Sequence, residues 1–184
     1  MNRKVNVNEL TPATRMHGDD EEDTLLLNGM LKEAERYLHG FAWCKEIQES
    51  YFGLGVGGIV GVFLFRIVPA RDDVDDWVWV IVGDLPPAYI TVDDAPNAAC
   101  ALDGYIGAMT KWVEAVLAGA SVERLIPVNA PATRESALAL RVRLAFLDEN
   151  ILKHYSQDLR ESCGDTVQNS SPRRHPPTPK QDAK

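Results

Sequence analysis

Apolar residues recur at two different spacings along the chain, and the change in spacing separates predicted helices from predicted strands. Over residues 24–40 they recur every three or four positions, which predicts an amphipathic helix. The same spacing continues over residues 42–52, where Cys44, Ile47 and Tyr51 form an apolar stripe. We therefore expect the globular part of the chain to begin with two helices.

Three segments further along are rich in β-branched and aromatic residues and are apolar on both faces. They cover residues 59–68, 77–83 and 88–92, and this composition is typical of strands in the middle of a sheet. The connections between them are too short to hold a crossover helix, so the strands are expected to form an antiparallel meander. Pro86 and Pro87 cannot donate to a β-ladder, which places the third strand at a sheet edge.

Helical spacing returns over residues 94–119 and again from a cap at Thr133 to about His154. The predicted fold is a single α+β domain over residues 24–155. About four helices pack on a three-stranded antiparallel meander, in the order ααβββαα. Residues 1–23 are polar and acidic, and residues 156–184 are rich in Pro and Ser. Both segments lack a periodic apolar set and are predicted to be disordered.

Charge restricts the classes of partner. The chain of 184 residues has a net charge of −8 at pH 7. The excess of acidic over basic residues lies in residues 1–155. Binding to a phosphate backbone needs a basic surface, so we expect neither DNA nor RNA as a partner. The longest apolar run, residues 53–65, is shorter than a membrane span, and no secretory signal is recognisable. We therefore expect a cytoplasmic protein that does not enter a membrane.

A glycine-rich stretch contains the one literal motif in the chain. Gly53, Gly55 and Gly58 match G-x-G-x-x-G, a pattern whose backbone N–H groups bind phosphates when a strand precedes it and a helix follows. Here the predicted order is the reverse, which favours a turn that needs a positive φ angle. If the chain does bind a small ligand, the candidate residues are these three glycines with Asp84 and Asn129.

No catalytic constellation is recognisable. The histidines show neither HxH nor HExxH spacing, and the three cysteines form no CxxC pair, so no zinc site is expected. No nucleophile has a base and an orienting group in a recognisable arrangement. The sequence therefore predicts no catalytic residue, no cofactor and no metal.

Tryptophan and aspartate gather around the second predicted strand. Trp77 and Trp79 alternate along it and so point to one face, next to four carboxylates in the preceding connection, Asp72, Asp73, Asp75 and Asp76. Aromatic side chains surrounded by charge are typical of protein interfaces. This holds if the valines between the tryptophans face the core. If helices cover both faces, the indoles belong to the core instead.

These observations favour a non-enzymatic, acidic protein-binding module, with a toxin-neutralising (immunity-like) or chaperone-like role and a basic protein as its partner. The alternative is an enzyme or small-ligand binder whose site is assembled from scattered residues. A third hypothesis is a homo-oligomer that pairs through the edge strand over residues 88–92.

Overall fold

A computed structural model describes residues 5–162 of the chain, with side chains described as far as Arg160. It contains one five-stranded antiparallel sheet with the strands in the order β1-β2-β3-β4-β5. The strands are β1 (Thr11–Pro12), β2 (Cys44–Val56), β3 (Val60–Pro69), β4 (Trp77–Gly83) and β5 (Ala88–Thr91). The α-helices are α1 (Glu21–His39), α2 (Ala98–Leu117), α3 (Arg134–Asn150) and the short α4 (Ser156–Ser162).

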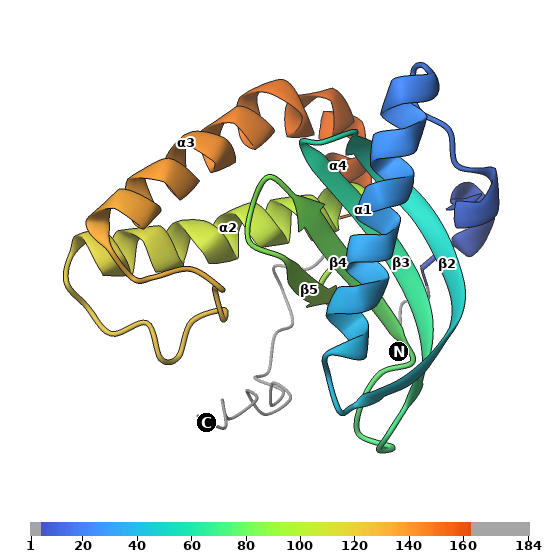
Figure 1. The fold of residues 1–184 in the computed structure, drawn as a ribbon, viewed down its shortest axis with the longest axis horizontal. Helices are drawn as coiled ribbons and strands as arrows, with labels where there is room; N and C mark the ends of the chain where they lie inside the picture. Colours follow the sequence, from blue (N-terminus) through green and yellow to red (C-terminus); the bar gives the residue numbers. More distant parts are fainter. Residues whose placement is uncertain (1–4, 163–184) are drawn as a thin grey trace.

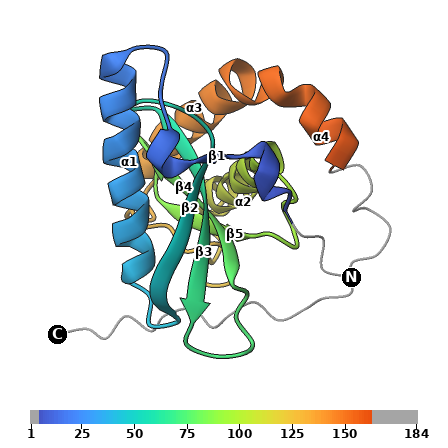
Figure 2. The same ribbon diagram turned by 90° about the vertical axis from the view of Figure 1, so that its right-hand side faces the viewer.

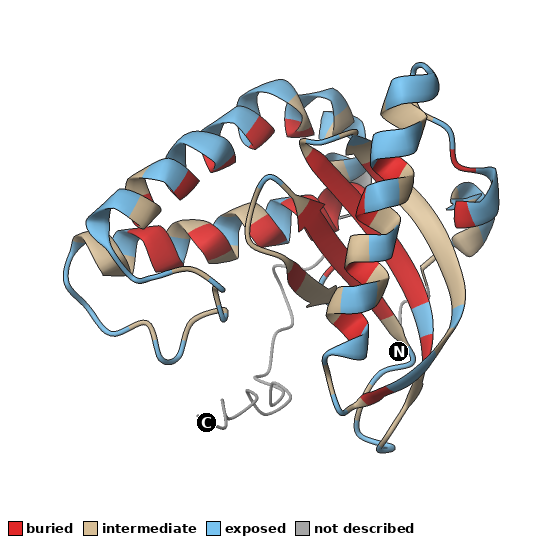
Figure 3. Ribbon diagram, in the orientation of Figure 1, coloured by how far each residue is buried: buried red, intermediate tan, exposed pale blue. Residues whose placement is uncertain are grey.

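Helices cover both faces of the sheet. Helix α1 lies along one face, and α2 lies on the other face with α3 packed against it (Figures 1 and 2). The buried residues follow this layering, because they concentrate on the central strands and on the helix faces turned toward the sheet (Figure 3). The chain is an α+β domain, as the sequence predicted.

The predicted second helix over residues 42–52 is wrong, because residues 42 and 43 form a turn and residues 44–52 belong to β2. The pairing of β2 with β3 shifts register between Cys44 and Glu46, and again between Ile47 and Glu49. Each such bulge inserts an extra residue and interrupts the two-residue alternation of a strand. The interruptions leave apolar residues three and four positions apart, which imitates a helical stripe.

The predicted three-stranded meander with about four helices is therefore corrected to a five-stranded sheet with three long helices. The fifth strand, β1, has only two residues, which pair with Tyr51 and Phe52 of β2. It lies in the segment 1–23, and α4 lies in the segment 156–184, so both are outside the range 24–155. The position of β5 at a sheet edge is as predicted.

Side-chain caps set the beginnings of the long helices. Thr133 caps α3 as predicted, and its hydroxyl accepts a hydrogen bond from the Ser136 N–H. Helix α1 begins slightly earlier than the sequence indicated, because Asp20 accepts from the Asp23 N–H at 2.8 Å. Helix α2 begins later, with Asn97 as its cap.

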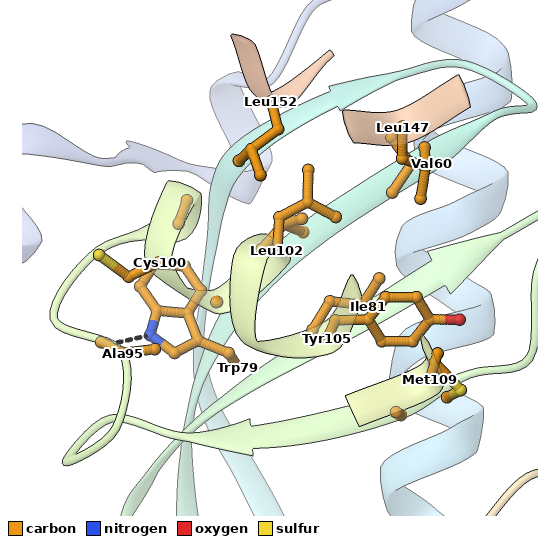
Figure 4. Packing of buried hydrophobic residues seen from close by; sticks show 14 of the residues in the cluster. Val60, Trp79, Ile81, Ala95, Cys100, Leu102, Tyr105, Met109, Leu147 and Leu152 are labelled. Atoms are coloured by element: carbon orange, nitrogen blue, oxygen red, sulfur yellow. Dashed lines mark hydrogen bonds between the residues drawn. The ribbon is translucent and has the colours of Figure 1, made fainter. Parts of the chain in front are cut away.

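The core consists of two apolar layers, one on each face of the sheet. The valines of β4 pack with α1, in a layer that includes Phe63, Phe65 and Leu38. Trp79 and Ile81 point the other way, into the layer formed with α2 (Figure 4). Trp79 is fully buried, and its indole N–H donates to the Ala95 carbonyl at 2.8 Å. The valines of β4 thus lie under α1, and Trp79 lies under α2 on the opposite face of the sheet.

Candidate functional site

The two ends of the sheet differ in their chemistry. The turn between β2 and β3 lies at one end, which we call the hairpin end, and the loop of residues 70–76 between β3 and β4 lies at the other, which we call the acidic end (Figures 1 and 2). Strand β3 runs between them over 10 residues, a length of about 33 Å. The sequence-predicted site residues divide between these two ends, with Asn129 elsewhere.

At the hairpin end, side chains of helix α1 contact the backbone amides of the glycine-rich stretch. The Asp23 carboxylate accepts a hydrogen bond from the Gly57 N–H at 2.6 Å, and the Met30 sulfur lies 3.3 Å from the Gly58 nitrogen. The turn joins two strands, and Gly58 has the positive φ, +75°. Gly53 and Gly55 lie within β2, where strand residues pair with β3. The amides of this turn therefore hold the N-terminal part of α1 in place.

Asp84 and Asn129 do not complete a ligand site with these glycines. The Asp84 carboxylate forms two hydrogen bonds with the Arg143 guanidinium, at 3.0 and 3.2 Å, and its N–H donates to the Ile59 carbonyl. Asp84 thus ties α3 to the hairpin end. Asn129 is exposed in the connection between α2 and α3. The structure brings Asp84 close to the turn but leaves Asn129 without a contact to it.

At the acidic end, carboxylates from two loops face one another. Asp72, Asp73, Asp75 and Asp76 are all exposed. Asp75 is nevertheless partly desolvated by its neighbours, and this desolvation, together with the carboxylates of Asp93 and Asp76, raises its pKa above the ordinary aspartate value. Asp93 follows β5, so the loops after β3 and after β5 meet here. Their shared negative charge creates a local field that favours a cation.

An aromatic cluster borders this loop on the α1 face of the sheet. It consists of Tyr37, Phe41, Trp43 and Tyr89, all partly exposed. Phe41 stacks on Trp43 with ring centroids 5.0 Å apart, and Tyr89 meets both rings edge to face at 5.5 and 5.2 Å. The Ala70 N–H donates to the Trp43 carbonyl at 2.8 Å, which holds the start of the acidic loop against the cluster.

Burial also acts on the tyrosine hydroxyls of this cluster. It raises the pKa of Tyr37 and of Tyr89, with the Tyr89 hydroxyl adding to the effect on Tyr37. Both tyrosines are therefore neutral hydrogen-bond donors at neutral pH. Val74, in the middle of the acidic loop, packs against the same apolar layer as Trp43 and Tyr89. Aromatic surface and acidic loop thus form one continuous region.

A second group lies on the α2 face, around Trp77. The Arg66 guanidinium carbon lies 5.8 Å from the centre of the Trp77 ring, and Arg66 also pairs with Glu49 at 2.8 Å. The Tyr51 hydroxyl donates to the other Glu49 oxygen at 2.6 Å, and hydrogen bonds from Tyr51 and Arg66 lower the pKa of Glu49. Arg66 thus places a cation of the same chain over the Trp77 ring.

Trp77 and Trp79 point to the same face of the sheet, as predicted. Their surroundings differ, however. Trp79 is in the core and exposes no surface, whereas Trp77 is half-buried beside the acidic loop. Phe41, Trp43 and Tyr89 were not among the residues predicted to bind a partner. They come from two stretches of the chain, the α1–β2 connection and β5, and the assignment of residues 42–52 to a helix concealed that β2 starts beside the β3–β4 loop.

Other features of the described residues do not form a recognisable catalytic site. A groove of about 280 Å³ runs between α2 and α3, with Ile106, Val113, Leu117 and Leu144 among its lining residues, and it contains none of the predicted site residues. Among residues 5–162, no three His, Cys, Asp or Glu side chains are arranged to hold a metal ion. No helix in this range combines the length and apolar character needed to cross a membrane.

Comparison of the chain with protein-family models, with curated proteins and with solved structures gave no match. Functional interpretation therefore depends on the geometry of the acidic end and of the aromatic cluster beside it.

Proposed function

We propose that this chain is a non-enzymatic protein-binding module that engages a basic protein partner through the acidic end of the sheet. The observation that carries the proposal is the continuity of the acidic loop with the partly exposed aromatic cluster of Tyr37, Phe41, Trp43 and Tyr89. Aromatic rings supply contact area with little loss of rotamer entropy, and carboxylates attract Lys and Arg side chains over several ångströms.

The charges at this end support a basic partner in particular. Within the described part of the chain, Arg71 pairs with Asp73 and Arg66 lies 3.9 Å from Asp76, whereas Asp72 and Asp75 form no ion pair. A partner cation can therefore satisfy carboxylates that the chain leaves without a counter-ion. A toxin-neutralising or a chaperone-like role fits such a surface, and the cytoplasmic location expected from the sequence belongs to the same proposal.

Site-specific photo-crosslinking tests the proposal. A photo-reactive amino acid placed at position 72 of the full chain is expected to capture a discrete partner from a lysate of the source cells. The matched control places it at Glu123, an exposed carboxylate in the α2–α3 connection. Mass spectrometry of the captured protein should identify a basic contact surface, and capture should fall steeply between 0.1 and 1 M salt, because screening shortens the Debye length from about 10 to 3 Å.

Trp43→Ala then tests the aromatic part of the surface. A central aromatic residue of an interface contributes about 2 kcal/mol or more, which corresponds to a loss of affinity of about thirtyfold. Equal capture from positions 72 and 123, or capture that neither salt nor Trp43→Ala reduces, contradicts a partner site at the acidic end. Subcellular fractionation tests the location separately.

A further inference from the structure

The acidic end and the aromatic cluster beside it are complementary, in charge and in apolar character, to a segment of the same chain. Residues 172–180 lie outside the described range and read Pro-Arg-Arg-His-Pro-Pro-Thr-Pro-Lys. Arg173, Pro176 and Pro179 are spaced three residues apart, and a polyproline II helix has three residues per turn. In that conformation, one edge of the segment would present two prolines and a guanidinium in a row.

Proline-rich segments of this kind bind to surfaces lined with aromatic rings. The aromatic cluster has such a surface, because the Phe41, Trp43 and Tyr89 rings meet at centroid distances of 5.0 to 5.5 Å and remain partly exposed. Such binding also needs donors for the carbonyls of the segment. Within the described residues, the Trp43 indole N–H and the Tyr89 hydroxyl form no hydrogen bond, so both are available.

Charge complementarity indicates which part of the segment would lie next to the acidic loop. Arg173 and Arg174 are adjacent cations in the segment, and the acidic loop beside the aromatic cluster contains Asp72, which has no ion-pair partner among the described residues. The loop is held against Trp43 by the hydrogen bond from Ala70. A proline-rich segment lying on the aromatic rings would therefore place its arginines next to the loop.

The described part of the chain ends close enough to the acidic loop for residues 173 and 174 to reach it. Asn97, at the start of α2, donates to the Asp158 carbonyl in α4 at 3.2 Å. Asn97 is four positions after Asp93, a span of at most about 14 Å, and Asp93 acts electrostatically on Asp75 of the acidic loop. From Ser162 to Arg173 there are eleven residues, which reach about 34 Å when extended. The arginines can therefore reach the loop of the same molecule.

We propose that residues 173–179 dock in cis on the aromatic cluster and the acidic loop, and that this segment competes there with the basic partner. The docking is a property of the isolated chain, whereas the competition rests on the proposed function. The C-terminal segment would then act as an internal competitor, displaced when a partner with higher affinity for the same carboxylates and rings is present.

Nuclear magnetic resonance of the full chain tests the docking without any partner. The double variant Arg173→Glu/Arg174→Glu should shift the backbone amide signals of Trp43, Asp72 and Tyr89, because reversed charges release the segment. Pro176→Ala/Pro179→Ala should shift the same signals in the same direction. The matched control Lys180→Glu/Lys184→Glu reverses two charges outside the spaced triplet and should leave these signals within a quarter of the shift.

Addition of a synthetic peptide of residues 170–182 to the Arg173→Glu/Arg174→Glu chain should restore the original signals. Millimolar peptide is expected to be necessary, since a tethered segment has an effective concentration of about that order. Shifts confined to residues 163–184 overturn the docking. Shifts at Trp43 that grow with protein concentration overturn its occurrence in cis, because they indicate the segment of a second copy.

The crosslinking experiment at position 72 measures the competition between residues 173–179 and the partner. Release of the segment in the Arg173→Glu/Arg174→Glu chain should increase partner capture at least threefold. Altered NMR signals together with no partner capture from any variant support the docking but contradict the proposed function. Unaltered signals together with salt-sensitive capture contradict the docking and leave the proposed function standing.

Discussion

The two ends of the sheet contain similar residue types but use them differently. At the hairpin end, the carboxylates of Asp23 and Asp84 each bond to a distant part of the chain, the first to the Gly57 N–H and the second to Arg143. At the acidic end, Asp72 and Asp75 bond to no charged group among the described residues. The hairpin end joins α1 and α3 to the sheet, whereas the described residues leave the carboxylates of the acidic loop exposed.

This difference separates structural carboxylates from candidate binding carboxylates. A carboxylate that already accepts hydrogen bonds within the fold gains little from a ligand, because binding must first replace those bonds. A carboxylate that is exposed and close to others of the same sign is relieved by an incoming cation. The contrast predicts that substitutions at the hairpin end change stability, whereas those at the acidic end change binding.

The largest expected effect is at Gly83, where β4 ends beside the hairpin. Its φ is +142°, and a Cβ there would collide with the Ile59 carbonyl. Gly83→Ala should lower the free energy of unfolding by about 3 kcal/mol, since strain and overpacking add. Gly107→Ala, on the exposed side of α2 with nothing within 4 Å, should instead raise it by about 0.5 to 1 kcal/mol. Urea unfolding measures both, and equal effects would contradict the steric argument.

Asp23→Ala tests the link between α1 and the hairpin. The Asp23 carboxylate accepts from the N–H groups of Gly57 at 2.6 Å and Asp19 at 2.9 Å, and loss of these charge-assisted bonds should lower the unfolding free energy by about 2 kcal/mol. Glu22→Ala removes the same charge from the same helix turn at an exposed position and should change it by less than about 0.5 kcal/mol. Similar destabilisation by both variants would assign the effect to helix charge alone.

The same contrast shows which parts of the fold the sequence could predict. The strands over 59–68 and 77–83 were predicted correctly, because they are apolar on both faces and no helical stripe competes with that pattern. Strand β2 was not, since its bulges near Cys44 and Ile47 disrupt the alternation on which the prediction depended. The two residues of β1 are too few for any periodic signal.

The candidate site depends on contacts that no local pattern reveals. The acidic loop was visible from its four aspartates, and the placement of Trp77 beside it followed from chain order alone. The approach of Trp43 and Tyr89 required the correct places of β2 and β5 in the sheet, the first paired with β3 and the second with β4. The choice between an exposed and a buried Trp79 needed the position of α2, which covers the second face.

A smaller effect is expected from Asp75→Asn, and it depends on pH. Burial and the carboxylates of Asp93 and Asp76 raise the folded-state pKa of Asp75 above its unfolded value of about 3.9. The folded protein therefore holds the proton more tightly, and this group reduces stability as pH rises from about 4 through the folded-state pKa. Asp75→Asn should be more stable than the original chain at pH 7, and the difference should vanish below about pH 4.

Urea unfolding between pH 3.5 and 7 measures this difference, with Asp72→Asn as a control that removes the same charge from the same loop. A stability advantage of Asp75→Asn that stays constant over this range would show that the amide, and not relief of the carboxylate, is responsible.

The smallest effect on stability is expected at the outer part of the acidic loop. Asp72 is exposed and unpaired within the described chain, and Asp73 forms an exposed ion pair with Arg71 at 3.0 Å. Such a pair contributes at most about 1 kcal/mol. Asp72→Asn/Asp73→Asn should therefore change the unfolding free energy by less than about 0.5 kcal/mol, while partner capture through a photo-reactive residue at position 93 falls at least tenfold. Asp84→Asn removes a carboxylate charge at the hairpin end and should leave capture unchanged, so that equal losses from the two variants would erase the functional distinction between the ends.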